Sequence, residues 1–84
     1  MFQARIYVTL KKGILDPQGN AVKGALASLG YKNVEEVRVG KYLVLSLSRS
    51  DRAGAEKEVQ EMCARLLANP VIEDYTYELQ EVSV

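Results

Sequence analysis

The chain has 84 residues, in which eleven basic and eleven acidic side chains cancel and histidine is absent. A chain this short buries only about 60% of the surface that its unfolded form exposes, so we expect one domain over residues 1–84. The zero net charge argues against binding to nucleic acid or to an anionic membrane. No apolar run approaches the roughly 18 residues of a membrane span, and the N-terminus lacks a signal-peptide pattern. The sequence therefore predicts a cytoplasmic protein.

The first predicted elements are a strand and a helix. Apolar and polar side chains alternate over residues 2–10, which predicts a half-buried strand. Asp16 suits the N-cap of a helix, and Pro17 suits the first helical position, where a missing N–H costs nothing. Gly30 is expected to end this helix in a left-handed conformation. The apolar face of the helix is predicted to consist of Val22, Ala25, Leu26 and Leu29.

The middle of the chain is extended by pattern on both sides of Gly40-Lys41. Residues 34–39 and residues 42–48 both favour strand structure, and a glycine at the first central position suits a two-residue turn. We expect a β-hairpin here, with one long bent strand as the alternative.

A second helix is predicted to begin after Asp51 and to end at Asn69-Pro70, since proline disfavours a helical conformation of the residue before it. The single cysteine, Cys63, is interpreted as a core residue rather than a reactive thiol. A last strand follows, in which Tyr75, Tyr77 and Leu79 alternate with polar residues. The inward face of the helix is predicted by the three-and-four spacing of Ala55, Val59, Met62, Cys63, Leu66 and Leu67.

The order strand, helix, two strands, helix, strand predicts an α+β fold. It is a two-layer sandwich with a βαββαβ ferredoxin-like antiparallel sheet and two helices on one face. The other face is left open, and a small domain gains stability from association, so we expect a homodimer or a higher homo-oligomer built partly on the sheet. The expected residues of the open face are Arg5, Tyr7, Thr9, Tyr42, Val44, Ser46 and Thr76.

No catalytic residue, cofactor site or metal site is predicted. Histidine is both the commonest general base and the commonest metal ligand, and one cysteine cannot assemble a triad or a zinc site without it. Tyr7 on the open face resembles the base-stacking residue of an RNA-recognition motif. The segment after Gly40 lacks the further aromatic residues of that motif, so we interpret Tyr7 as a sheet-packing residue.

Three segments, in order, resemble the PurS family, the small subunit of phosphoribosylformylglycinamidine synthase. They are a Gly-Ile-Leu-Asp-Pro-Gln-Gly segment from Gly13, an Arg-Val-Gly-Lys segment from Arg38, and a Leu-Leu-Ala-Asn-Pro-Val-Ile-Glu-Asp-Tyr segment from Leu66. The resemblance spans nearly the whole chain. It implies a complex in which a glutaminase subunit, PurQ, releases ammonia from glutamine. A synthetase subunit, PurL, uses ATP and Mg²⁺ to convert formylglycinamide ribonucleotide (FGAR) to formylglycinamidine ribonucleotide (FGAM).

In this resemblance the small subunit contacts both partners, assists the transfer of ammonia and carries no catalytic residue or cofactor of its own. The competing interpretation is an ACT-like regulatory module, which would bind a small effector between protomers. By the resemblance to PurS, the partner surface is placed on Asp16, Pro17, Gln18, Gly19, Arg38, Gly40, Lys41, Asn69, Pro70, Glu73 and Tyr75.

Overall fold

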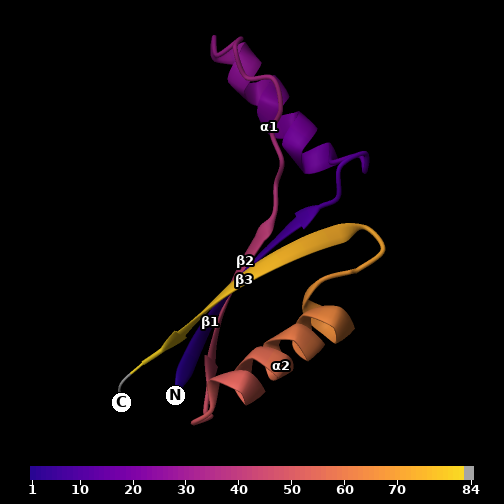
Figure 1. Cartoon of the computed structure of the whole chain (residues 1–84). Helices are drawn as coiled ribbons and strands as arrows, with labels where there is room; N and C mark the ends of the chain where they lie inside the picture. Colours follow the sequence, from indigo (N-terminus) through magenta and orange to yellow (C-terminus); the bar gives the residue numbers. More distant parts are fainter. Residues whose placement is uncertain (83–84) are drawn as a thin grey trace.

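A computed structural model describes residues 1–82 and confirms an α+β fold with an antiparallel sheet. The three strands lie in the order β2-β1-β3, so that β1 is central and pairs with a neighbour on each side. Figure 1 shows α2 lying against this sheet. The elements are β1 (Phe2–Leu10), α1 (Pro17–Ser28), β2 (Lys41–Leu47), α2 (Arg52–Met62), a π-helical turn η1 (Cys63–Leu67) and β3 (Glu73–Glu81).

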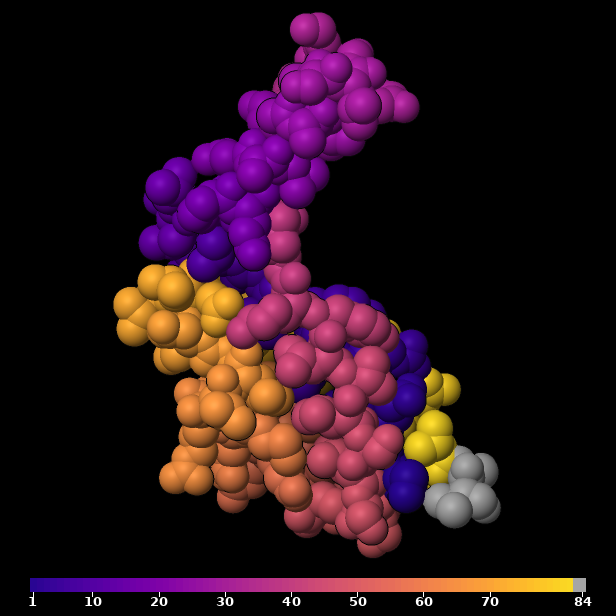
Figure 2. Space-filling view, turned by 180° about the vertical axis from the view of Figure 1, so that it is seen from behind, coloured from indigo at the N-terminus to yellow at the C-terminus, as the bar shows by residue number. Residues whose placement is uncertain are grey.

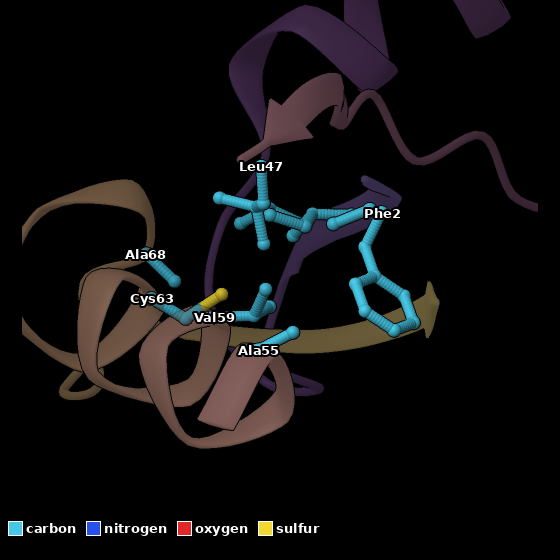
Figure 3. Close-up of a cluster of buried hydrophobic side chains, with 9 residues drawn as sticks. Phe2, Leu47, Ala55, Val59, Cys63 and Ala68 are labelled. Atoms are coloured by element: carbon cyan, nitrogen blue, oxygen red, sulfur yellow. The ribbon is translucent and has the colours of Figure 1, made fainter. Parts of the chain in front are cut away.

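The core lies between β1 and α2. The alternation predicted for the first strand is confirmed, since every second side chain of β1, from Phe2 to Val8, is at most 1% exposed. Ala55, Val59 and Cys63 of the α2–η1 helix point onto that row from the other layer (Figure 3). Cys63 is fully buried, which confirms its interpretation as a core residue, and burial raises the pKa of its thiol.

The opposite face of the sheet is open, as predicted. Tyr7 on β1 and Tyr42 on β2 stack there with ring centroids 5.0 Å apart, and the Tyr7 hydroxyl donates a hydrogen bond to Glu78 on β3 at 3.3 Å. Arg5 and Gln80 are also hydrogen-bonded across this face. These pairs tie all three strands together on the side that α2 does not cover.

The position of α1 corrects the expectation that both helices cover one face of the sheet. The helix begins as predicted, with Asp16 as N-cap and Pro17 in the first turn, and Gly30 adopts a positive φ of 99° after its end. It then projects away from the sheet (Figure 1), and the molecule measures 50 × 29 × 14 Å. Val22 and Leu29 on its apolar face are 42% and 73% exposed. We call residues 11–40 the α1 arm.

The predicted β-hairpin is also wrong, and of the alternative, one long bent strand, only the second part is formed. Residues 34–40 form no strand, and β2 begins at Lys41. The physical reason is that the segment before β2 is bound to the base of the arm instead of to a strand: the N–H of Val39 donates to Asp16, and the Arg38 side chain donates to the carbonyls of Leu10 and Lys11. Gly40 lies outside any tight turn and instead passes so close to β1 that an added Cβ would overlap the carbonyl oxygen of Val8.

The end of the second helix differs from a regular helical pattern. Asp51 caps α2 as predicted, and the chain is extended again at Ala68, just before Asn69-Pro70. Between them the five residues of η1 form a π-helical turn, which rotates the side chains relative to a 3.6-residue period. Leu66, predicted to face inward, is therefore 82% exposed.

Candidate functional site

The candidate site lies where the α1 arm leaves the sheet, and we call this region the arm junction. It is the end of the sheet where β1 ends, β2 begins and the turn before β3 returns the chain. The N–H of Lys11 donates to the carbonyl of Ile72 at 2.8 Å, and the ammonium of Lys41 lies 3.7 Å from the Glu73 carboxylate. Segments that are far apart in the sequence thus meet at one end of the sheet.

Two segments connect α1 to the sheet: the outgoing leg, residues 10–16, and the returning leg, residues 29–40. Asp16 joins these two legs through its carboxylate. Its Oδ1 accepts a hydrogen bond from the N–H of Gly19 at 2.9 Å, which caps α1. Its Oδ2 accepts from the N–H of Val39 on the returning leg, also at 2.9 Å. The side chain is only 6% exposed, and these two backbone donors hold the pKa of the Asp16 carboxyl below its usual range. Asp16 therefore stays ionised at neutral pH and is poorly suited to donate a proton.

Arg38, on the returning leg, binds backbone carbonyls of the outgoing leg. Its Nη2 donates to the carbonyl oxygens of Leu10 at 2.9 Å and of Lys11 at 2.8 Å. Its Nη1 approaches the carbonyl of Ile14 at 3.4 Å. The planar guanidinium presents several donors in a fixed arrangement, so one side chain can hold three carbonyls of the outgoing leg.

Gly19 lies in the first turn of α1 and is buried against the returning leg. A Cβ at this position would overlap the carbonyl oxygen of Val37 and would also crowd the Asp16 carboxylate. The helix and the returning leg are therefore in direct backbone contact at the base of the arm, and this contact requires glycine.

The third segment is anchored by Glu73, at the start of β3. Its carboxylate accepts from the N–H of Asn69 at 2.7 Å, while the side-chain oxygen of Asn69 accepts from the N–H of Val71 at 3.1 Å. Lys41 donates to the carbonyl of Leu67 at 3.4 Å besides its ion pair with Glu73. The turn before β3 is thus tied to the first residue of β2.

Two shallow pockets lie at the junction and share Glu73 as a lining residue. The first, of about 340 Å³, brings together predicted residues from all three segments: Asp16, Pro17, Gln18, Gly40, Lys41 and Glu73. The second, of about 380 Å³, includes Pro70 and Tyr75. Gly19 and Arg38 lie in the arm base, and Asn69 contacts Glu73. The structure therefore gathers the sequence-predicted residues at one end of the sheet, at the base of the α1 arm, and their contact with a partner stays a prediction.

Sequence reasoning missed the apolar surface of the junction. Leu15 is 73% exposed and Val71 is 77% exposed, in the two turns that flank β1 and β3. Protein interfaces contain exposed aliphatic side chains together with polar groups, so these two residues are candidates for a protein contact. Both residues belong to the segments that carry the resemblance to PurS, which was the available clue.

Other classes of site find little support among the described residues. Over residues 1–82, no three histidine, cysteine, aspartate or glutamate side chains lie together as ligands for a metal ion. In the same residues, no helix has the length and apolar character needed to cross a bilayer.

The comparison with known proteins decides the family. The family model of PurS, described as phosphoribosylformylglycinamidine (FGAM) synthase, matches residues 3–81. The chain belongs to the PurS family. The PurS subunit of Bacillus subtilis is 52% identical over 82 residues, which are 98% of this chain and 96% of that protein. The PurS subunit of Methanocaldococcus jannaschii is 39% identical over 98% of this chain and 99% of its own length.

Solved PurS structures share the fold over almost the whole chain. The structure of B. subtilis PurS superposes with a TM-score of 0.87 and covers 96% of this chain and 100% of that one. The structure of PurLQS from Thermotoga maritima includes a chain that is 28% identical, with a TM-score of 0.85, and the match covers 94% of this chain and 96% of that one. The resemblance stated from the three sequence segments is thereby confirmed as PurS membership.

Proposed function

We propose that this chain is a small non-catalytic subunit of FGAM synthase that bridges the glutaminase PurQ and the synthetase PurL and assists ammonia transfer in purine biosynthesis. The supporting observation is PurS family membership over residues 3–81, together with the likeness to a chain of the T. maritima PurLQS structure. In this proposal ATP and Mg²⁺ bind to the synthetase, the complex is a glutamine-hydrolysing ligase, and the protein acts in the cytoplasm.

The arm junction is the surface that we assign to the partner subunits. It combines exposed aliphatic residues such as Leu15 and Val71 with the polar groups of Gln18 and Lys41. Protein interfaces combine apolar and polar residues in this way.

A bridging role acts through geometry rather than through bond-breaking chemistry. Ammonia released by a glutaminase is protonated or lost to bulk water unless the two active sites are held in register. A subunit that aligns them raises the effective concentration of ammonia at the synthetase without contacting a substrate. The internal use of Asp16 and Arg38 fits this view, because both side chains are occupied in holding the backbone.

We further propose that the subunit is a homo-oligomer in which the α1 arm contacts a second copy. The apolar face of α1 has no counterpart in its own sheet, and Leu29 is 73% exposed. We call the sheet with α2 the body of the molecule. Figure 2 shows a notch between the α1 arm and this body. Burial of such apolar surface is worth about 25 cal/mol per Å², which favours association of a small domain.

The body offers a place for a second helix. Among residues 1–82, α2 and η1 form the one helical segment that covers the core side of the sheet. An apolar groove of about 290 Å³ lies between this segment and the edge strand β2, lined by Leu45, Met62, Leu66 and Leu67 among others. A ferredoxin-like fold has a second helix on this face. The proposed occupant is therefore the α1 helix of the second copy.

The decisive experiment compares two nitrogen sources. Formation of the amidine product by purified PurL and PurQ is measured with glutamine and with ammonium, each with and without this chain. We expect glutamine-driven synthesis to require the chain and ammonium-driven synthesis to be nearly independent of it. Equal glutamine-driven rates without the chain would overturn the bridging role.

A further inference from the structure

The direction in which the α1 arm projects is set by hydrogen bonds at its base rather than by packing along its length. Gly19, in the first turn, is the residue of α1 that is buried, and the helix projects away from the sheet (Figure 1). Without a packed face against its own sheet, a helix held by two flexible connections would sample many directions. Something else must therefore hold the arm.

The contacts at the base all join the outgoing leg to the returning leg. Asp16 binds Val39 across 23 positions, and Arg38 binds the carbonyls of Leu10, Lys11 and Ile14 across 24 to 28 positions. Farther along the arm, the ammonium of Lys23 donates to the carbonyl of Glu35 at 2.7 Å. We call the Asp16–Val39 and Arg38–carbonyl contacts the arm joint.

We propose that Asp16 and Arg38 are positioning residues: the arm joint holds α1 in the direction that self-association and partner binding require, so that little ordering is needed when the complex forms. Because the α1 arm is already ordered before binding, less conformational entropy is lost on association. This inference rests on the proposed function where it concerns the partner subunits and the second copy. The rigidity of the joint stands independently of it.

The chain provides a matched control for Asp16. Asp51 caps α2 with the same spacing, accepting from the N–H of Gly54 at 2.9 Å, but its other contact is an ion pair with the nearby Arg49. In Asp16→Asn the single carbonyl oxygen can cap the helix or accept from Val39, and the amide group that replaces the second oxygen repels an N–H donor. Asp51→Asn removes a comparable acceptor without touching the arm.

Arg38 has a matched control as well. In Arg38→Lys the charge remains, but one ammonium cannot reproduce the fork that reaches three carbonyls. Arg52 donates to one carbonyl, that of Leu79, at 3.2 Å, and lies over the Phe2 ring. Arg52→Lys therefore tests the general effect of exchanging arginine for lysine in this protein.

Three measurements on the full-length variants test the joint. Hydrogen exchange at the Val39 amide reports whether the joint is intact. Sedimentation equilibrium gives the dissociation constant for self-association under conditions where each variant is folded. Glutamine-driven synthesis, titrated with the variant, gives the concentration for half-maximal rate and the rate at saturation.

For Asp16→Asn and Arg38→Lys we expect faster exchange at Val39 and a dissociation constant raised roughly tenfold, as for the loss of one charge-assisted hydrogen bond. The concentration for half-maximal synthesis rises by a similar factor, and the saturating rate stays within about twofold of wild type, because ordering affects affinity rather than turnover. Asp51→Asn and Arg52→Lys should leave all of these values near wild type.

Slow exchange at Val39 in Asp16→Asn would overturn the joint itself. Fast exchange with unchanged self-association and an unchanged titration would overturn its positioning role. If wild-type protein has no effect on glutamine-driven synthesis, the proposed function fails instead, and the sedimentation comparison still decides whether the joint positions the arm.

Discussion

Gly19 in the first turn of α1 lies against the carbonyl oxygen of Val37 on the returning leg, with no room between them for a side chain. The contact closes the base of the arm, and it brings the N–H of Gly19 onto the Asp16 carboxylate. One position near the start of a helix therefore determines how closely the two legs of the arm can approach.

Replacing Gly19 by alanine should destabilise the protein, since the added Cβ meets a backbone atom that cannot move alone. Overpacking of this kind costs about 1–3 kcal/mol. Gly24→Ala in the same helix is the matched control, because a Cβ at that position would meet no atom within 4 Å other than its chain neighbours and the backbone of its own helix. It should stabilise the helix by roughly 0.5–1 kcal/mol. Urea unfolding at one fixed protein concentration measures both, and a Gly19→Ala protein as stable as Gly24→Ala would contradict the observed contact.

The two aspartate N-caps should make the free energy of unfolding depend on pH in the acidic range. Backbone donors to Asp16, and Arg49 together with Gly54 beside Asp51, hold the pKa of each carboxyl below its usual range. A lowered folded-state pKa gives stability that is present above the unfolded value of about 3.9 and is lost as the pH falls through the folded value. The free energy of unfolding should thus decrease as the pH falls below about 4. Asp16→Asn should reduce that slope in urea titrations, and an unchanged slope would show that Asp16 is ordinary in the folded state.

The core and the groove should respond differently to the loss of a large side chain. Ile6 is fully buried, and Ile6→Ala should cost about 2–5 kcal/mol at any protein concentration. Leu66 is 82% exposed, so Leu66→Ala should change the stability of the dilute protein by less than about 0.5 kcal/mol.

If the α1 helix of a second copy binds the groove that contains Leu66, stability should depend on protein concentration. The melting temperature of wild type should rise with concentration, since association stabilises the folded state, and Leu66→Ala should show a smaller rise. If Leu66→Ala destabilises the dilute protein as strongly as Ile6→Ala does, Leu66 belongs to the monomer core, and this result would contradict the π-helical turn.

Much of the local structure was predictable because its causes are local. The alternation from Phe2 to Leu10 identified both the buried face and the open face of β1. The helix starts at Pro17 and Arg52 follow from an aspartate N-cap in each case. Leu66 was mispredicted because a π-helical turn shifts the side chains by an amount that a 3.6-residue pattern does not reveal.

Part of the candidate site was likewise predictable from the sequence, and part was not. The segments that carry the PurS resemblance named residues of the arm junction, and the comparisons confirm that family. The sequence did not indicate that the second acceptor site of Asp16 binds Val39 or that Arg38 holds three carbonyls. These contacts join positions more than 20 residues apart, so no local spacing encodes them.

By itself, then, the sequence determined where the two helices begin, which side chains of β1 face the core and which family the chain resembles, because capping, alternation and motif order depend on neighbouring residues. Only the tertiary structure decided that residues 34–40 stay unpaired and that α1 leaves its own sheet. An extended pattern does not specify its partner strand. An apolar helix face of modest size does not specify whether its own sheet or a second molecule buries it, because both remove the same surface from water.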